Sequence, residues 1–342
     1  MKTFISLGTL VLFLGTIAQG EGTRDSVFVI PAWSLPSIFK NKDKNKIIPR
    51  EIHEVINADG WRTFDLLVIT DMDNDSKMES ENWKWRAITR KGKLTLAADN
   101  TTVKVDWVEG SDHELTSGLN YKGRAMELSD LSEYNGHLLS PDDKTGLLYD
   151  IKDDKAIPWV FLNSGPGNTT KGMKVEWLTI KDNLLYAGGH GSVKSENWTD
   201  VFSRIRWAAG YPAPGYLTHE AVQWSDKLQR WLFLPRKASL TPYVESEDET
   251  KGANILIRGN VELTKFLTVS IGGAEVKHPD RGFSAFDFIP GTEDRLIVAL
   301  KSKEVEGSDP ESYITVFDID GVVLLEDQKL EGNYKFEGIY FV

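Results

Sequence analysis

The sequence contains no cysteine among its 342 residues. Disulfide bonds, thiol nucleophiles and cysteine metal sites are therefore excluded. A chain of this length can bury a large apolar core. We expect its stability to come from that core rather than from covalent cross-links.

Long hydrophobic runs are also scarce. The most extended one, residues 5–14, lies between Lys2 and the small-residue site Ala18-Gln19-Gly20, which is the layout of a secretory signal peptide. A membrane anchor is the alternative, but the run is shorter than the roughly 20 apolar residues that span a bilayer. We expect residues 1–20 to be a signal peptide and the protein to be secreted and extracellular, without a membrane segment. Four N-glycosylation motifs fit secretion: Asn74, Asn100, Asn168 and Asn197.

Positive charge is in deficit, since 40 Lys and Arg face 51 Asp and Glu and the formal net charge is −11. An acidic chain is a poor scaffold for polyanions unless cations assist it. Nucleic acid and anionic membranes are therefore not expected as partners, and nothing points to an obligate protein partner.

Several catalytic signatures are missing. The chain has no G-x-x-x-x-G-K-[ST] loop, no G-x-S-x-G elbow and no H-E-x-x-H motif, and its 6 histidines form no pair at ligand spacing. These absences argue against P-loop NTPases, serine hydrolases and zinc peptidases.

Helical periodicity is limited, and short β-rich runs closed by turn residues dominate. We expect one helix over Ser195 to Ala209 and a shorter one over Pro49 to Ile56. Representative strands are Phe64 to Ile69, Leu147 to Ile151, Arg230 to Leu234 and Tyr313 to Phe317, and representative turns contain Asn135-Gly136 and Asp182-Asn183. The pattern predicts an all-β chain.

A repeat underlies these strands: a polar residue opens an apolar strand, and a turn and a second apolar strand follow. Five such openers occur roughly every 50 residues, the spacing of propeller blades: Ser129, Glu176, Glu220, Ser284 and Glu337. The last opener has one strand after it, so we expect that strand to pair with Phe64 to Asp71 and close the ring. The prediction is a five-bladed β-propeller over residues 61–342, with residues 21–60 as an extension packed on it. A pair of β-sandwiches with coincidental spacing is the alternative.

Equivalent positions on the innermost strands of a propeller converge on its axis. Three of the five openers are glutamates, and burying unpaired carboxylates is costly. An all-oxygen set without His or Cys favours Ca²⁺, and Asp130 beside Ser129 could add an oxygen. For any one glutamate taken alone, a solvated strand end is the simpler interpretation.

A second acidic cluster follows the first apolar strand. Asp71-Met72-Asp73-Asn74-Asp75 imitates an EF-hand loop, but Ser76 and Asn82 stand where that loop needs Gly and Glu. Asp142-Asp143 follows a later strand similarly. Paired carboxylates near a metal suit activation of water, and Arg124 and Lys174 could hold phosphates. These aspartates could equally be turn residues without a function.

Long ordered motifs from about Phe64 onward resemble the soluble calcium-activated nucleotidase (apyrase) family, and most closely the secreted salivary apyrases of blood-feeding arthropods. The principal ones are Gly123-Arg124-Ala125-Met126-Glu127-Leu128-Ser129-Asp130-Leu131, Ser140-Pro141-Asp142-Asp143-Lys144-Thr145-Gly146, Pro214-Gly215-Tyr216-Leu217-Thr218-His219-Glu220, Lys251-Gly252-Ala253-Asn254 and Phe336-Glu337-Gly338-Ile339. Ala125, Pro141 and Lys144 depart from the family pattern near the expected site, so the base preference is not carried over.

The resemblance implies a five-bladed propeller with Ca²⁺ in its channel and hydrolysis of nucleoside di- and triphosphates such as ADP and ATP. The implied metal ligands are Ser129, Asp130, Glu176, Glu220, Ser284 and Glu337. The implied catalytic carboxylates are Asp71 and Asp143, with Asp73 and Glu127 as further candidates, and the candidates for holding phosphate are Arg124, Lys174 and Arg236.

The expected reaction is in-line attack of water on the terminal phosphoryl group, with removal of platelet-activating ADP as the biological role. Two alternatives belong to other classes. A calcium-dependent lactonase or esterase would also use a propeller with an axial metal, and a non-enzymatic propeller would sequester nucleotide without turnover.

Overall fold

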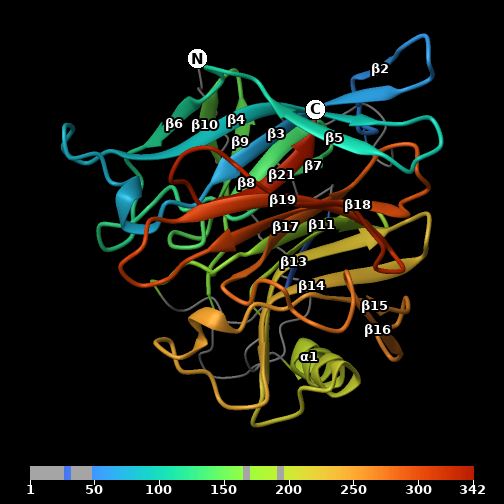
Figure 1. The fold of residues 1–342 in the computed structure, drawn as a ribbon. Helices are drawn as coiled ribbons and strands as arrows, with labels where there is room; N and C mark the ends of the chain where they lie inside the picture. Colours follow the sequence, from blue (N-terminus) through green and yellow to red (C-terminus); the bar gives the residue numbers. More distant parts are fainter. Residues whose placement is uncertain (1–26, 32–47, 165–169, 191–195) are drawn as a thin grey trace, which may run out of the picture.

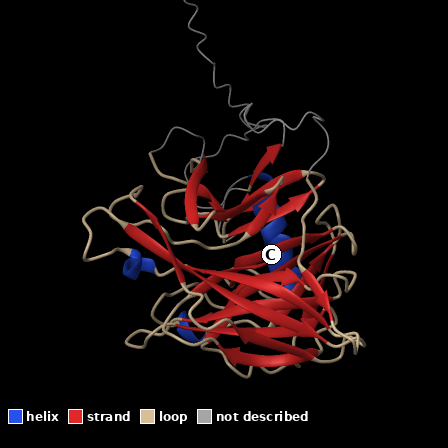
Figure 2. Ribbon diagram, turned by 90° about the horizontal axis from the view of Figure 1, so that it is seen from above, coloured by secondary structure: helices blue, strands red, loops and turns tan. Residues whose placement is uncertain are grey.

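The computed structural model describes residues 27–31, 48–164, 170–190 and 196–342. The expected signal peptide, residues 1–20, and Asn168 lie outside these ranges. Strands dominate and helices are few (Figure 2). No helix in the described ranges is both long and apolar enough to cross a membrane.

The strands form five antiparallel sheets, each a blade of a propeller (Figure 1). The first contains β2 (Glu54–Ile56), β3 (Arg62–Thr70), β4 (Trp85–Leu96), β5 (Val103–Trp107), β6 (His113–Ser117) and β21 (Phe336–Phe341). The second contains β7 (Ser132–Tyr134), β8 (His137–Pro141), β9 (Leu147–Lys152) and β10 (Lys155–Phe161). The third contains β1 (Phe28–Pro31), β11 (Trp177–Lys181) and β12 (Leu184–Gly188).

The fourth blade contains β13 (Tyr216–Ser225), β14 (Arg230–Ser239), β15 (Ile255–Gly259) and β16 (Phe266–Ser270). The fifth contains β17 (Arg281–Phe288), β18 (Leu296–Lys303), β19 (Glu311–Asp318) and β20 (Val323–Lys329). Two 3₁₀ turns, η3 (Asp73–Ser76) and η4 (Asp248–Thr250), lie in loops. Strand β11 contacts β7 and β13, and β17 contacts β13 and β21, so the inner strands follow one another around the ring. The prediction of a five-bladed propeller is confirmed.

Ring closure occurs where the sequence predicts it. Strand β21 pairs antiparallel with β3, with Phe336 opposite Thr70 and Phe341 opposite Leu66. Gly338 permits this approach, because a Cβ at that position would lie 2.8 Å from the backbone carbon of Asp130. Closure removes the unpaired edges that an open array of blades would expose.

Five hydrophobic clusters fill the gaps between successive blades. Strand β3 shows why its sequence is apolar without interruption. Leu66 and Val68 enter the cluster shared with the fifth blade, whereas Leu67 and Ile69 enter the cluster shared with the second. A strand that is buried on both faces needs no polar alternation.

The single α-helix in the described ranges, α1 (Glu196–Ala209), matches the predicted helix. Val201, Phe202 and Ile205 face the cluster between the third and fourth blades, and the helix contacts β16 (Figure 1). The predicted helix over Pro49 to Ile56 is wrong. Glu54–Ile56 form β2, which is exposed and hydrogen-bonds to β3, because pairing with an open strand edge outweighs the weak helical spacing of so short a segment.

Candidate active site

The five openers lie at the inner strands, and all are buried. Ser129 precedes β7, Glu176 precedes β11, and Glu220, Ser284 and Glu337 lie within β13, β17 and β21. The three glutamates are connected through basic side chains. His190 Nε2 contacts Glu176 at 3.0 Å and Glu220 at 2.8 Å.

Arg236 continues this connection. Its Nη1 donates to Glu220 at 2.6 Å and to Glu337 at 2.9 Å. Because Arg236 and His190 outweigh the effect of burial, the pKa of Glu220 is held below its usual range. The pKa of Glu337 rises well above its usual value, chiefly through burial. The structure thus brings the predicted glutamates together and adds the cations that compensate them.

In the chemistry of their donor atoms, the openers suit a calcium ion. The hydroxyl of Ser129 is buried and has no hydrogen-bond partner in the part of the chain that the structure describes, so it is available to a ligand. Ser284 Oγ donates to the carbonyl of Phe336 at 3.0 Å. Carboxylate, hydroxyl and carbonyl oxygens are the ligands that Ca²⁺ prefers.

Asp130 has a different environment from the glutamates. Its carboxylate accepts from the backbone N–H groups of Leu131 at 2.8 Å and Leu178 at 2.6 Å. Its carbonyl accepts from Ser140 Oγ at 2.7 Å. The Asp130 carboxylate therefore joins the second and third blades beside the axial set.

The second acidic cluster assembles at the end of β3. Carboxylate oxygens of Asp71, Asp73 and Glu127 lie within 4.8 Å of one another. The backbone reverses directly after β3: Asp73 adopts a φ of 47°, and its N–H donates to Asp71 Oδ1 at 2.8 Å. This turn holds the Asp71 carboxylate against the backbone of the loop that follows β3.

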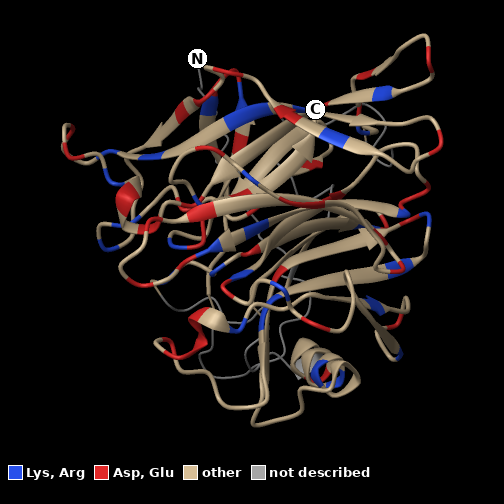
Figure 3. Ribbon diagram, in the orientation of Figure 1, with Lys and Arg blue, Asp and Glu red and all other residues tan. Residues whose placement is uncertain are grey.

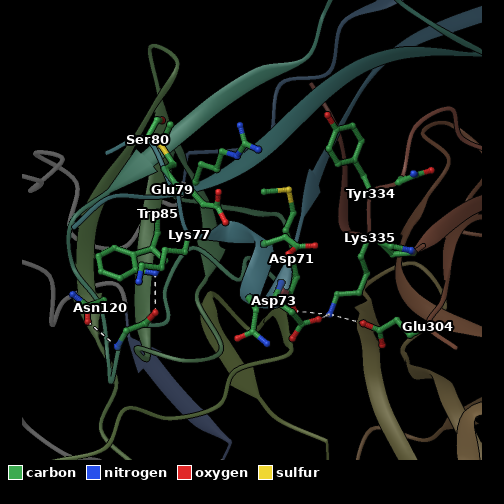
Figure 4. Close-up of a pocket in the computed structure, with 18 of the residues that line it drawn as sticks. Asp71, Asp73, Lys77, Glu79, Ser80, Trp85, Asn120, Glu304, Tyr334 and Lys335 are labelled. Carbon is green, nitrogen blue, oxygen red and sulfur yellow. Dashed lines mark hydrogen bonds and ion pairs between the residues drawn. The ribbon is translucent and has the colours of Figure 1, made fainter. Parts of the chain in front are cut away.

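Two cations hold this cluster together. Lys335 Nζ contacts Asp71 at 2.9 Å and Asp73 at 2.6 Å (Figure 4). Arg124 donates to Asp73 at 2.8 Å and to both oxygens of Glu127 at 2.6 Å. Each carboxylate is therefore paired with at least one cation.

Burial sets the proton affinities in this cluster. It raises the pKa of Asp71 to about 6, with Asp73 and Asp143 adding to the rise and Lys335 opposing it. Burial, followed by Asp71 and Asp143, raises the pKa of Glu127 to about 8. Although burial alone would raise it, Lys335 holds the pKa of Asp73 below its usual range. A carboxylate with a pKa near 7 is the stronger proton acceptor at neutral pH.

The two aspartates after β8 have separate roles. Asp142 accepts from the backbone N–H groups of Met126, Lys144 and Thr145 at 2.9 to 3.2 Å, and so shapes the loop. Asp143 pairs with Lys174, and with Lys144 at 3.2 Å. These cations overcome burial and lower its pKa, while Asp143 Oδ1 has no partner in the described ranges.

A cavity of about 1910 Å³ opens at this cluster. Asp71, Asp73, Lys335 and Glu304 lie on one side of it, and Trp85 and Asn120 lie on another (Figure 4). Acidic and basic residues are interspersed over the rest of the ribbon (Figure 3). The lysine and arginine side chains can hold a phosphate chain, and the carboxylates can accept a proton from water.

Sequence reasoning missed several basic side chains at the site, above all Lys335 and His190. A signal was present, because Lys174 and Lys335 each stand two residues before an opener, Glu176 and Glu337. Each of these lysines lies just before an inner strand, Lys174 before β11 and Lys335 before β21. Both lysines indeed contact their opener.

Comparisons with known proteins agree with this site. A family model described as Apyrase matches residues 72–192 and 189–342. Apyrase apy-1 of Caenorhabditis elegans is 45% identical over 308 residues, which cover 83% of this chain and 85% of that protein. Soluble calcium-activated nucleotidase 1 of Rattus norvegicus is 43% identical over 308 residues, 83% of this chain and 75% of that protein. Apyrase of Cimex lectularius is 38% identical over 304 residues, 82% of each.

The fold, the site and these relatives define an enzyme of one class, a nucleotide phosphohydrolase built on a five-bladed propeller. The resemblance read from the sequence motifs is confirmed. The chain belongs to the apyrase family.

Proposed function

We propose that the protein is a secreted, calcium-dependent apyrase that converts nucleoside triphosphates and diphosphates to the monophosphate and inorganic phosphate. The observation that carries this is the cluster of Asp71, Asp73 and Glu127, held by Lys335 and Arg124 beside the cavity. Relatives named apyrase and soluble calcium-activated nucleotidase support the substrate and the metal.

Asp71 is the proposed base. It accepts a proton from the attacking water as the water oxygen bonds to the terminal phosphorus and the bond to the bridging oxygen breaks. A pKa of about 6 leaves Asp71 ionised at neutral pH yet basic enough to accept that proton. Asp143 is the weaker candidate, because Lys174 and Lys144 lower its pKa.

Basic side chains orient the phosphates. Arg124 is the proposed clamp, because its side chain is one-third exposed and joins two carboxylates of the cluster. Lys174 and Arg236 contact the buried axial carboxylates Glu176 and Glu220 and are also proposed to contact phosphate. Glu127 fixes the direction of the Arg124 guanidinium.

The axial oxygens are the proposed calcium ligands: Ser129, Asp130, Glu176, Glu220, Ser284 and Glu337. Bound calcium supplies positive charge that offsets negative charge developing on the phosphate oxygens. We also propose that the mature protein comprises residues 21–342, with residues 21–60 as an N-terminal extension packed on the propeller. Its proposed biological role is to block platelet aggregation by removing ADP.

Phosphate release from a panel of nucleotides in Ca²⁺, Mg²⁺ or chelator tests the proposal. We expect release from ADP and ATP in Ca²⁺ and a large loss in chelator or in Mg²⁺ alone, because Mg²⁺ demands near-octahedral geometry and retains its waters. Aryl esters and lactones serve as control substrates. Turnover of those compounds without ADP turnover, or nucleotide binding without phosphate release, would refute it.

A further inference from the structure

Trp83 is the most exposed large hydrophobic side chain in the described ranges, at 73%. It lies in the loop between η3 and β4, which closes through a backbone hydrogen bond from Met78 to Lys84 at 3.0 Å. Its φ of 61° is left-handed, a conformation that non-glycine residues seldom adopt and that clusters at functional sites. Exposure of an indole and backbone strain both oppose folding, so neither is explained by stability.

The indole of Trp83 is braced from behind. Trp85 is 1% exposed, and its Nε1 donates to the carbonyl of Gly123 at 2.9 Å. The two indoles meet edge to face, with ring centroids 6.2 Å apart and planes at 62°. The buried, hydrogen-bonded Trp85 thus limits the movement of a ring that is otherwise open to solvent.

Trp83 lines the same cavity as the acidic cluster. Asp71 and Lys335 lie in one part of that cavity, while Trp85 and Asn120 lie in another (Figure 4). Lys335 lines this cavity, so a nucleotide whose phosphates contact Lys335 can extend its nucleoside along the cavity wall. An exposed aromatic face on that wall matches the flat face of a base.

We infer that Trp83 is the platform on which the nucleobase of the substrate stacks, an assignment that rests on the proposed nucleotide hydrolysis. Stacking does not depend on the base's hydrogen-bonding pattern, because every base has a π face. The subsite therefore favours nucleoside polyphosphates over base-free polyphosphates while discriminating weakly between bases. Trp83 binds substrate and takes no part in proton transfer.

The test compares Trp83→Ala with the control Trp207→Ala. Trp207 is 71% exposed and lies on α1, outside the cavity lining. The probes are α,β-methylene-ADP, which carries a base but resists cleavage at its bridge, and inorganic pyrophosphate, which lacks a base. Binding is measured in Ca²⁺ by quenching of tryptophan fluorescence and by calorimetry.

We expect Trp83→Ala to weaken α,β-methylene-ADP binding about 10- to 100-fold, the range for loss of one stacked base. Its pyrophosphate affinity and the behaviour of Trp207→Ala should match the unmodified protein. Trp83→Phe should retain most of the affinity, and Trp83→Leu, apolar but without a π face, should not. If Trp83→Ala does not unfold cooperatively, Trp83→Leu takes its place in the binding comparison.

Equal affinity of Trp83→Ala and the unmodified protein for the analogue would overturn the inference. So would an equal loss of affinity for pyrophosphate, because that result assigns Trp83 to the shape of the loop. Failure of the proposed function gives a different result: the unmodified protein binds the analogue but releases no phosphate from ADP.

Discussion

Lys335 offers the sharpest test of the electrostatics of the site. Its ammonium group contacts Asp71 at 2.9 Å, Asp73 at 2.6 Å and Glu304 at 3.0 Å, and its side chain is 7% exposed. Substitution Lys335→Met retains the length and apolar stem of the side chain and removes the charge. The carboxylates around it then lose their common cation.

Removing one partner from a buried ion pair typically costs about 3–5 kcal/mol, because the other charge is left buried and uncompensated. At roughly 2–4 °C per kcal/mol for a domain of this size, Lys335→Met should lower the melting temperature by roughly 6 to 20 °C. Thermal unfolding is followed by circular dichroism at neutral pH in chelator, so that no added metal replaces the missing charge.

Lys329→Met is the matched control. Lys329 pairs with Glu311 at 2.7 Å, but its side chain is 49% exposed, and exposed pairs contribute about 0–1 kcal/mol. The control should therefore shift the melting temperature by about 4 °C at most. If the two variants shift it equally, the carboxylates do not depend on Lys335, and the account of the cluster is wrong.

Three further outcomes are expected. Ca²⁺ should raise the melting temperature above its value in chelator through binding to the folded state, and Glu176→Gln should reduce that rise; a melting temperature indifferent to both would argue against a shared axial cation. Asp71→Asn should lower turnover of ADP about 10²- to 10⁴-fold while calcium stabilisation survives, with Asp75→Asn on the same loop as control; full activity would remove Asp71 from catalysis. Gly338→Ala places a Cβ 2.6 Å from Ile69 Cγ2, and overpacking of this kind costs about 1–3 kcal/mol, so an unchanged melting temperature would contradict the tight closure.

The fold was predictable because the blade pattern is local. The hairpin turns could be predicted from Asn135-Gly136 and Asp182-Asn183, because these residue types tolerate positive φ. All four residues adopt a positive φ in the structure, from 51° at Asp182 to 81° at Gly136. These turns join β7 to β8 and β11 to β12. Closure of the ring could be predicted because one strand near the N-terminus, Phe64 to Asp71, had no partner in the repeat. The helix predicted over residues 49–56 was wrong because β2 has only three residues, all exposed, and so shows no alternation of apolar and polar side chains.

The site was only partly predictable. Equivalent positions in a repeat identify Glu176, Glu220 and Glu337 without knowledge of contacts. Other pairings join residues that are far apart in the sequence: Arg236 meets Glu337 across 101 positions, and Lys335 meets Asp71 across 264. The exposure and backbone strain of Trp83 are properties of the folded loop, and no residue pattern predicts them.

The pairing of β3 with β21 also constrains how the protein is made. Among the described strands of the ring, β3 is synthesised early and its partner last, so on the ribosome the edge at Leu66 to Thr70 waits for residues 336–341 to emerge. An unpaired apolar strand edge is a template for association with other chains. Premature termination before residue 336 would therefore leave the β3 edge at Leu66 to Thr70 without its partner and open to association with other chains.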